Sequence, residues 1–588
     1  MGIFKKLGWF FKQQKKRYIA GILFLLLVDL AGVVPPRVIG ILADLMNERR
    51  LTTRLLFMWV GLLLIAAIFQ YLSRYGWRNM IWGGAATLER ELRTNLFSHF
   101  LKMDETFFQR HRTGDLMAHA TNDLNAIQNV AGSGILTFAD SILTGGTTII
   151  AMIVFVDWRL TLVALIPMPL LAISARILGS RLHQAYGESQ AAFSRLNDKT
   201  QESISGIKVI KTFGQAKEDI DDFEGIVDRT IDINRKVYRI DSLFGPVTSM
   251  IIGLTYAVTI MYGGWLVTTH MITLGQLISF VSYIGTLVWP MFAIGRLFNV
   301  IERGNASYDR VYQLLDEKSL IKERSHATEH LAAGDISYHV AAFTYPDDEE
   351  VSLQNIDFDL PAGGTLGIVG RVGAGKTTII KLLLRQFDNY EGEIKIGGKN
   401  IKDYTLEGLL SSIGYVPQDN FLFSTSIRNN IRFAAMDKTQ DEVESAARQS
   451  AIHDDILNFS RQYDTLVGEK GVSLSGGQKQ RLAISRALIT LPEILILDDA
   501  LSAVDAKTEA SILTSLKEDR SRKTTIISSH RLSGVMNADQ ILVVDDGRVV
   551  ERGTHDELLA LNGWYAEMWR RQQLAAQLGV GGAEDGAK

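Results

Sequence analysis

The glycine-rich stretch Gly370–Thr378 holds the residue types and spacing that most clearly specify chemistry in this chain. It follows the apolar run Thr365–Val369 and precedes the helix-like run Ile379–Leu384. Glycines let a backbone come close to an anion, and N–H groups at the start of a helix then hold phosphates. In such a P-loop Lys376 would reach the β- and γ-phosphates, and the Thr377 hydroxyl would bind Mg²⁺. A chance glycine-rich turn is disfavoured by the flanking strand and helix, so the stretch predicts a nucleoside triphosphate site. The residues expected to contact ATP are Gly370, Arg371, Val372, Gly373, Ala374, Gly375, Lys376, Thr377 and Thr378.

Four polar residues further along the chain suit hydrolysis of a bound nucleotide. Asp498 ends the apolar run Ile494–Leu497, and an acid at such a position beside a P-loop holds Mg²⁺ through its ligand shell. Asp499 follows, at the position of a general base for the attacking water. His530 ends another apolar run, and Gln418 follows a third and can reach both metal and water. Strands often end in a polar residue, so each signal is weak alone; four in this order are specific.

The sequence around these motifs predicts a separate α/β domain. Residues 316–334 are mostly polar and charged and indicate a linker. Alternating strand signals, the P-loop and then helix and strand units follow, which is typical of an α/β domain with a mainly parallel sheet. We assign residues 335–575 to this domain. Residues 576–588 are rich in Gly and Ala and are expected to be disordered.

The first half of the chain has a different composition. A length of 588 residues exceeds what one core supports, and long uncharged runs lie in the first half. Six segments approach the roughly 20 residues of a spanning helix, so we assign residues 18–315 to a membrane bundle. Short connections join the segments in pairs, and long polar stretches separate the pairs. The six segments are about Tyr18–Met46, Leu55–Trp77, Ile135–Val156, Leu160–Leu178, Val247–Thr269 and Leu274–Val300.

Residues 1–17 interleave aromatic residues with lysines. They form either an interfacial helix on the inner membrane face or a plain basic lead-in to the first span. Both interpretations place the N-terminus in the cytoplasm by the positive-inside rule, although Arg49, Arg50 and Arg54 in the first outer loop oppose that rule. An even number of spans returns the second half of the chain to the side where ATP is found.

Charge and cysteine content exclude some classes of function. The formal net charge of -3 argues against a nucleic-acid binder, which usually carries a basic excess. The chain has no cysteine, so it forms no disulfide and no thiolate metal site.

Two features of the first half leave alternatives open. Glycines interrupt helical periodicity in the inner stretches Phe107–Leu116 and Gly206–Gly214, but spacing alone favours solvated helical turns over segments that touch the ATP-binding domain. Asp29 and Asp140 lie in apolar runs, where a charge costs about 2.5–3.5 kcal/mol. They either line a polar cavity for cationic substrates or form hydrogen bonds between helices.

A run near residue 475 carries a family resemblance. It matches the signature that separates ABC transporter ATPases from other P-loop proteins, with residues Leu474, Ser475, Gly476, Gly477 and Gln478. Tyr345 resembles the aromatic residue that stacks on adenine, Gln418 the Q-loop glutamine and His530 the switch histidine. The D-loop is matched by Ser502, Ala503 and Asp505. Thr465–Gly471 resembles the segment before the signature in exporters, with Leu466 where an acid is usual.

With six preceding spans, the chain up to about residue 575 is similar to bacterial multidrug-type ABC exporter half-transporters. The resemblance implies a membrane α-helical bundle of six transmembrane helices followed by an α/β P-loop ATPase domain. It places the chain in the bacterial cytoplasmic membrane with the ATPase domain in the cytoplasm.

In that family two chains close on ATP head to tail, so the resemblance implies a dimer. Ser475, Gly476 and Gly477 would then meet the γ-phosphate in the partner chain's site. The two inner stretches match the family's coupling helices, which reverses the preference drawn from spacing.

One residue departs from the family pattern. The family has glutamate directly after the Walker B aspartate, which corresponds to Asp498 here. This chain has Asp499 at that next position. Losing one methylene withdraws the carboxylate by about 1.5 Å, and misplacing a catalytic group by about 1 Å costs on the order of 10²-fold in rate. We therefore expect the slow ATP site of a heterodimer whose partner carries glutamate. The alternative is a homodimer that tolerates aspartate.

These features predict ATP-driven export of amphipathic small molecules, either drugs or lipids, with ATP and Mg²⁺ as cofactors. Thr377, Gln418 and Asp498 are the expected Mg²⁺ residues. The expected partners are a second half-transporter, membrane lipids and the substrate, and no nucleic acid. The alternatives are a homodimeric flippase and an ATP-gated membrane regulator that transports nothing.

Overall fold

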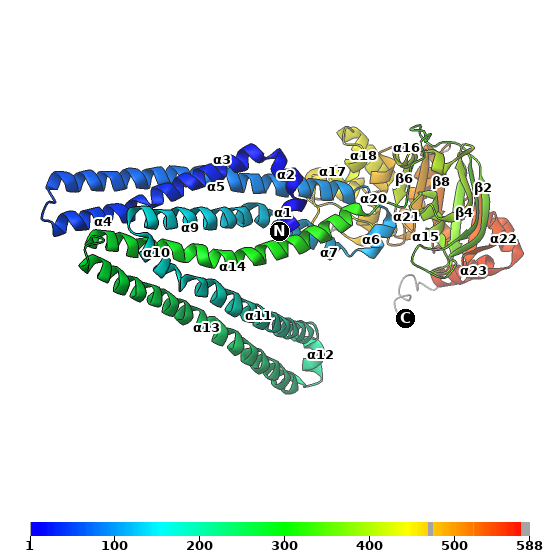
Figure 1. The fold of residues 1–588 in the computed structure, drawn as a ribbon. Helices are drawn as coiled ribbons and strands as arrows, with labels where there is room; N and C mark the ends of the chain where they lie inside the picture. The colour runs from blue at the N-terminus through cyan, green and yellow to red at the C-terminus, as the bar shows by residue number, and fades with distance from the viewer. Residues whose placement is uncertain (1, 469–473, 521, 578–588) are drawn as a thin grey trace. The chain divides into compact units, whose positions relative to one another are not determined.

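The computed structural model describes residues 2–468, 474–520 and 522–577 and divides into two compact units (Figure 1). The helical unit comprises Met1–Lys102 and Arg112–Glu317, and the sheet unit comprises Met103–His111 and Lys318–Lys588. Most of the predicted disordered tail lies outside the described residues, as do the last residues of the segment 465–471, whereas residues 576 and 577 end a helix.

Six helical stretches of the described chain are long and apolar enough to cross a membrane, as predicted. They are Lys15–Asn47, Thr53–Phe100, Thr113–Phe155, Trp158–Ser205, Ala216–Thr268 and Leu274–Asp316. The elements of the helical unit are α1 (Gly2–Lys6), α2 (Gly8–Gln13), α3 (Lys15–Gly32), α4 (Val34–Asn47), α5 (Thr53–Phe100), α7 (Thr113–Ala118), η1 (His119–Asp123), α8 (Leu124–Asn129), η2 (Val130–Gly134), α9 (Ile135–Phe155), α10 (Trp158–Leu165), α11 (Met168–Ser205), α12 (Ile207–Thr212), α13 (Ala216–Thr268) and α14 (Leu274–Asp316).

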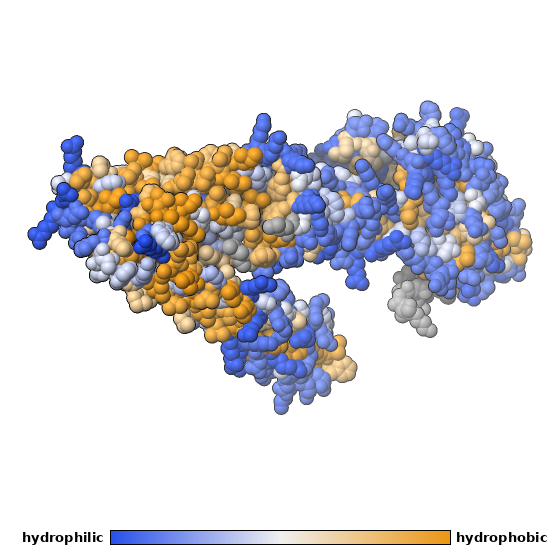
Figure 2. All heavy atoms as spheres, in the orientation of Figure 1, coloured by the Kyte–Doolittle hydropathy of each residue, from blue (hydrophilic) through white to orange (hydrophobic). Residues whose placement is uncertain are grey.

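The surface of the long helices is apolar along much of their length. Figure 2 shows orange, hydrophobic residues along the long helices, with blue, hydrophilic residues at their ends and over the sheet unit. Side chains such as Phe57, Ile65 and Val154 are exposed there. A helix satisfies its own backbone hydrogen bonds and needs only an apolar exterior to lie in lipid.

The first spanning helix is broken by two prolines. Pro35 and Pro36 carry no backbone N–H, so α3 ends at Gly32 and α4 begins anew at Val34. The two parts then pack against different neighbours: α3 runs along α5, and α4 packs mainly against α14. The break therefore sends the outer end of this helix towards the last span.

The sheet unit is built on two sheets. One is antiparallel, in the order β2-β1-β4-β5, and the other has the order β10-β9-β3-β8-β7-β6 and is parallel except for the edge strand β10. The second sheet is the mainly parallel sheet that the sequence predicts, whereas the separate antiparallel sheet was not predicted. The strands are β1 (Ile336–Phe343), β2 (Leu353–Leu360), β3 (Thr365–Gly370), β4 (Tyr390–Ile396), β5 (Lys399–Asn400), β6 (Ile413–Val416), β7 (Ile494–Asp498), β8 (Thr524–Ser528), β9 (Gln540–Asp545) and β10 (Arg548–Gly553).

Helices cover these sheets and enclose separate cores. One core lies among β1, β2, β4 and α15, a second among β7, β8, α20 and α21, and a third among the small helices α17 to α19 and α20. The helices are α6 (Glu105–Arg110), α15 (Lys376–Leu383), η3 (Ile401–Asp403), α16 (Leu406–Ser411), α17 (Ile427–Ile431), η4 (Arg432–Ala434), α18 (Gln440–Gln449), α19 (His453–Leu457), η5 (Gln462–Asp464), α20 (Gly476–Leu488), α21 (Ala506–Asp519), η7 (Leu532–Gly534), α22 (His555–Leu561) and α23 (Trp564–Gln577).

The inner stretch Phe107–Leu116 covers the end of α6 and the start of α7, with Gly114 inside α7, so this glycine does not interrupt a helix. The stretch Gly206–Gly214 contains the short helix α12. α6 belongs to the sheet unit, and the Arg110 guanidinium donates two hydrogen bonds, of 2.8 and 2.7 Å, to the carboxylate of Asp347. α12 belongs to the helical unit and has no buried residue.

Candidate ATP site

The predicted catalytic residues lie at the carboxyl ends of neighbouring parallel strands. β3 pairs with β8 and β8 pairs with β7, with Asp498 opposite Ser528 in the register. β6 lies beyond β7, and the chain continues from its end to Gln418. Ligands of open α/β sheets bind at this edge because the strand ends and the following loops meet there.

The P-loop connects β3 to α15 through positive backbone angles. The φ values of Gly370, Gly373 and Gly375 are 150°, 79° and 102°, a region that favours glycine. A Cβ atom on Gly370 would lie 2.0 Å from the carbonyl oxygen of Val544, so the loop also needs glycine for space.

Lys376 is held inside this loop. Its ammonium group donates hydrogen bonds to the carbonyl oxygens of Gly370 (3.0 Å) and Arg371 (2.8 Å). Burial lowers the pKa of Lys376, and the carboxylates of Asp499 and Asp498 act in the opposite direction. The loop therefore presents a preorganised cation with two acids nearby, which suits a nucleotide with its metal ion.

A pocket of about 370 Å³ brings most of the predicted residues together. Its lining includes P-loop residues Val372 to Thr378 together with Tyr345, Gln418, Asp498, Asp499 and His530. Sequence reasoning missed the remaining lining residues, which are Asp348, Glu350, Val351, Ser352, Ser528, Asp546 and Gly547. Ser528 carried a signal as the end of an apolar run; the others lie in loops without a motif.

Asp498 provides an oxygen suited to a metal ion. It is 1% exposed, and burial raises the pKa of its carboxyl group. Its Oδ2 atom is buried and has no hydrogen-bond partner among the described residues. A buried carboxylate oxygen without a donor is costly unless a cation meets it. This donor set, with the Thr377 hydroxyl in the same pocket, fits a hard divalent cation such as Mg²⁺.

Asp499 has a constrained backbone. Its φ is 48°, a left-handed value that aspartate tolerates better than most residues. Its N–H donates to the carbonyl oxygen of Ser528 at 2.9 Å, and its own carbonyl oxygen accepts from the Ser502 hydroxyl at 2.9 Å. Such strain is common at functional sites, where the surrounding contacts maintain it.

Tyr345 is fixed at the rim of the pocket. Its hydroxyl group forms a 2.9 Å hydrogen bond with the Thr378 hydroxyl. Its ring packs edge-on against Phe343 and Phe387, with centroids 5.0 and 5.2 Å away. The ring therefore keeps one position beside the P-loop, as the sequence-based role in adenine stacking requires.

The signature residues lie apart from this pocket, since none of Leu474 to Gln478 is among its lining residues. Ser475 caps α20: its hydroxyl accepts from the N–H of Gln478, whose side chain accepts from the N–H of Ser475. The cap fixes the start of this 13-residue helix, which carries the positive end of the helix dipole. Such a helix start is suited to binding an anion.

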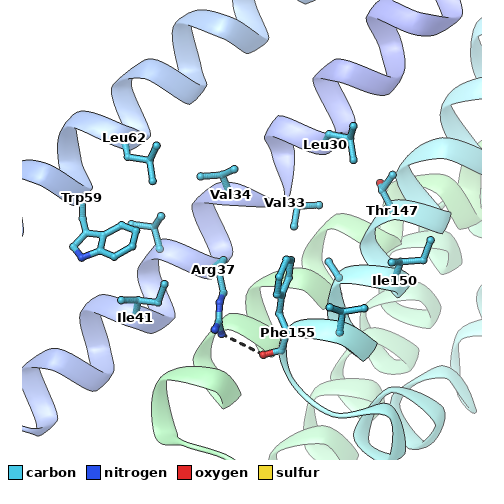
Figure 3. Close-up of a pocket in the computed structure, with 13 residues that line it drawn as sticks. Leu30, Val33, Val34, Arg37, Ile41, Trp59, Leu62, Thr147, Ile150 and Phe155 are labelled. Atoms are coloured by element: carbon cyan, nitrogen blue, oxygen red, sulfur yellow. Dashed lines mark hydrogen bonds between the residues drawn. The ribbon is translucent and has the colours of Figure 1, made fainter.

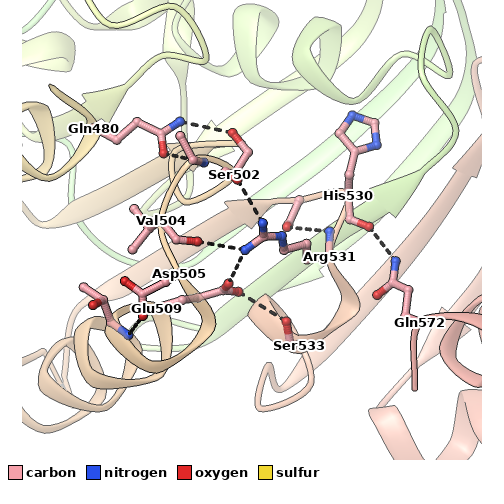
Figure 4. Close-up of polar contacts among 12 residues, drawn as sticks. Gln480, Ser502, Val504, Asp505, Glu509, His530, Arg531, Ser533 and Gln572 are labelled. Atoms are coloured by element: carbon pink, nitrogen blue, oxygen red, sulfur yellow. Dashed lines mark hydrogen bonds and ion pairs between the residues drawn. The ribbon is translucent and has the colours of Figure 1, made fainter. Parts of the chain in front are cut away.

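A polar network fixes the D-loop, which follows β7 and comprises Ser502–Asp505 (Figure 4). The Gln480 amide donates to the Ser502 hydroxyl (3.1 Å) and accepts from the N–H of Ala503 (2.9 Å). Arg531 donates to the carbonyl oxygens of Val504 (2.9 Å) and Ser502 (3.1 Å). Asp505 caps α21.

The same network reaches the switch histidine (Figure 4). Arg531 forms an ion pair with Glu509, which is 3% exposed. Gln572 in α23 donates to the carbonyl oxygen of His530 and accepts from the N–H of Leu532, both at 2.9 Å. The sequence alone did not indicate any of the four supporting residues, which are Gln480, Glu509, Arg531 and Gln572. Gln480 and Arg531 adjoin motifs, whereas Gln572 lies 42 positions from His530 and carries no local signal.

The two intramembrane aspartates are brought together in the helical unit. The Thr144 hydroxyl lies 2.8 Å from Asp29 Oδ1 and 3.3 Å from Asp140 Oδ1. Asp29 is on α3, and the other two residues are on α9. This geometry is the hydrogen-bonded arrangement between helices; a role in binding cationic substrates stays a prediction.

Known proteins share this architecture. Residues 18–291 match the ABC transporter transmembrane region and residues 353–502 the ABC transporter family. The chain is 44% identical over 582 residues to the probable multidrug resistance ABC transporter ATP-binding/permease protein YheI of Bacillus subtilis, covering 99% of this chain and 100% of that protein. It is 41% identical to the multidrug resistance-like ATP-binding protein MdlA of Escherichia coli, with 98% of each covered. A solved bacterial Atm1-family ABC exporter with ATP bound aligns at a TM-score of 0.74 and 26% identity, covering 98% of this chain and 99% of that one.

These similarities extend over the whole length of the chain and agree with the geometry. The sheet unit is an ATP-binding domain in which ATP hydrolysis is coupled to transport, and exporters of this kind work as dimers. The spanning helices place the chain in the bacterial inner membrane with its ATPase domain in the cytoplasm. The chain therefore belongs to the multidrug-type ABC exporters of bacteria, in which one polypeptide carries both the transmembrane region and the ATP-binding domain.

Proposed function

We propose that this chain is one half of a heterodimeric exporter of amphipathic small molecules and that its own P-loop forms the slower of two ATP sites. The observation that carries the proposal is Asp499 at the position of the general base. Its carboxylate is one methylene shorter than that of a glutamate and stops about 1.5 Å short of the water that a glutamate would reach. The P-loop and Asp498 are intact, so ATP binds and turns over slowly.

The position of the signature supports a partner chain. The cap of α20 prepares an anion-binding helix start, yet Ser475 and its neighbours do not line this chain's own pocket. A second chain whose P-loop faces this helix start would complete one site, and this chain's P-loop would face the partner's signature. In that arrangement Ser475, Gly476 and Gly477 assist hydrolysis in the partner's site.

Mg²⁺ would be held by Thr377, Asp498 and Gln418, all of which line the pocket. When bound, the ion neutralises negative charge that develops on the phosphates. Lys376 binds the β- and γ-phosphates, the loop N–H groups hold them in place, and Tyr345 positions the adenine. The backbone of His530 is anchored through Gln572, and its side chain would contact the γ-phosphate region.

An amphipathic substrate is supported by the character of the membrane bundle and by relatives named for multidrug resistance. The exposed surface of the long helices is apolar, so a ligand that partitions into the bilayer reaches the bundle from within the membrane. A regulator that binds ATP and moves nothing is the competing function. Accumulation of an amphipathic dye in inside-out vesicles on addition of ATP separates the two, because a regulator gives none.

The Asp499→Glu substitution tests the slow site. Restoring the reach of a glutamate should raise the ATP turnover of the purified chain alone by about ten- to a hundredfold. Asp437→Glu makes the same chemical change at an exposed position outside the pocket and should leave turnover unchanged. Robust turnover of the unaltered chain that Asp499→Asn abolishes, with no gain from Asp499→Glu, would overturn the proposal in favour of an active homodimer.

A further inference from the structure

A pocket of about 410 Å³ lies beside the proline break of the first spanning helix (Figure 3). Helices α3, α4, α5 and α9 form its walls. The lining residues are Leu30, Val33, Val34, Arg37, Val38, Ile41, Trp59, Leu62, Thr147, Ile150, Ala151, Val154 and Phe155. The pocket lies within the helical unit, and the ATP site does not contribute to it.

The pocket exists because α4 leaves α5 and is held against α14. A Cβ atom on Gly40 would lie 2.3 Å from the carbonyl oxygen of Gly275, so the two backbones meet directly. Asp44 accepts hydrogen bonds from the N–H of Gly275 (2.7 Å) and the hydroxyl of Thr273 (2.6 Å). These contacts fix the direction of α4 after the break and leave the space next to α5 unfilled.

The walls are apolar apart from Thr147, the indole N–H of Trp59 and one cation. Arg37 points into the space shown in Figure 3, and its guanidinium donates to the carbonyl oxygen of Phe155 at 3.2 Å. Its charge lies 5.5 Å from the centre of the Phe155 ring. Among the residues that the structure describes, no carboxylate forms an ion pair with Arg37. A cation among apolar spanning helices is costly, so it normally has a counter-charge or reaches the interface.

Arg37 lies beside the end of the spanning helix α9. Phe155, its partner, is the last residue of α9, and the connection to α10 contains Asp157. The helix rises about 15 Å from Arg37 to the end of α4 at Asn47, so the guanidinium lies below the outermost loops. Leu30, Ile150 and Val154 are about half exposed or more and leave the pocket open sideways. An acyl chain would enter the pocket through this opening.

We propose that this pocket binds an anionic phospholipid, with its phosphate paired to Arg37 and an acyl chain between the apolar walls. Charge complementarity selects this occupant. A neutral helix of a partner chain would cover the apolar walls and leave the cation unpaired, whereas a phosphate accepts hydrogen bonds from a guanidinium in a bidentate manner. The proposed lipid site does not depend on which of the two ATP sites hydrolyses ATP more slowly.

Quenching of Trp59, which lines the pocket, tests this site. The full chain is reconstituted in phosphatidylcholine vesicles that contain phosphatidylglycerol with brominated acyl chains, or equally brominated phosphatidylcholine. The signal of Trp59 is the difference between the wild type and Trp59→Phe. One close cation favours the anionic lipid by about fivefold, and this preference is the expected result.

Two charge variants complete the experiment. Arg37→Gln should remove the preference and Arg37→Lys should keep most of it. Arg54→Gln, which removes an exposed charge from the same side of the membrane outside the pocket, should keep all of it. If Arg37→Gln fails to insert, 1 M salt applied to the wild type should remove the preference, since it shortens the screening length to about 3 Å. Equal quenching by the two lipids, a preference that survives Arg37→Gln, or no quenching by either lipid would overturn the proposal. The last outcome would mean that a partner helix fills the pocket.

Discussion

The two short inner helices α6 and α12 occupy equivalent places in the two inner connections, yet their environments differ. α6 packs with the chain's own ATPase unit, and its Phe107 is 4% exposed. α12 has no buried residue, and its C-terminal neighbour Phe213 is 73% exposed. α6 packs within the ATPase unit, and α12 presents apolar side chains that its own helical unit does not cover.

The contacts of α6 show which interactions attach a short inner helix to an ATPase unit. Asp104 caps the helix by accepting from the N–H of Phe107 at 3.1 Å, and it also accepts from the hydroxyl of Ser319. Glu105 lies 4.0 Å from Lys381 on α15, the helix that begins at the P-loop. This contact joins α6 to the helix that begins at the P-loop. In the described part of the helical unit, α12 has no buried residue and makes no corresponding contacts, and exporters of this kind work as dimers.

The largest effect is expected from truncating Phe107, the buried side chain of α6. Phe107→Ala removes a buried aromatic ring and should destabilise the ATPase unit by about 3–5 kcal/mol. Differential scanning fluorimetry of the purified chain measures this as a lower Tm. An unchanged Tm would mean that α6 is not part of the compact ATPase unit.

The matched change at α12 should leave the fold stable and reduce the coupling between ATP hydrolysis and transport. Phe213→Ala removes a ring that is exposed in this chain, so Tm should stay constant. If the ring is buried in a partner, transport should fall by about ten- to a hundredfold, because burying such a side chain contributes about 1.5–3 kcal/mol. ATP-driven dye uptake into inside-out vesicles measures the loss. Full transport by Phe213→Ala would show that α12 has no such partner.

The smallest effect is expected at the exposed ion pair of α6. The Arg110 guanidinium lowers the pKa of Asp347 below its ordinary value of 3.8. Because the pKa is lowered, the contribution of the ion pair to stability is fully present above pH 3.8. It is lost as the pH falls through the lower pKa of the folded state. Asp347→Asn should therefore reduce transport slightly and equally at every pH from about 5 to 8, since exposed pairs contribute little. A marked dependence on pH in this range would contradict the assignment of the contact to Arg110 and Asp347.

Much of the fold and of the site follows from local patterns. Runs of apolar residues near spanning length predict the six helices, and the P-loop between an apolar strand and a helix predicts the site around Lys376. Asp498 and His530 were found because parallel strands bring their carboxyl ends to one edge. These features need only short stretches of sequence to specify them.

Contacts between distant segments were beyond sequence reasoning. Nothing near Gln572 indicates that it anchors the backbone of His530, and nothing near Arg37 indicates that Phe155 accepts its hydrogen bond. The glycines of the stretches Phe107–Leu116 and Gly206–Gly214 predict two similar inner segments, but only the structure shows that α6 is packed and α12 is exposed. Such differences depend on tertiary packing, which local periodicity does not encode.

The central claim is that this chain's signature supports the faster hydrolysis while its P-loop holds ATP at the slower site. The most direct test is the ATP turnover of the exporter purified with the half-transporter that it assembles with. Ser475→Asp keeps the helix cap, since aspartate caps as well as serine, and places a negative charge where the partner's γ-phosphate would lie. We expect Ser475→Asp to lower turnover by about a hundredfold or more, whereas Lys376→Ala should leave most of it in place. Equal losses in the two variants, or a larger loss in Lys376→Ala, would contradict it.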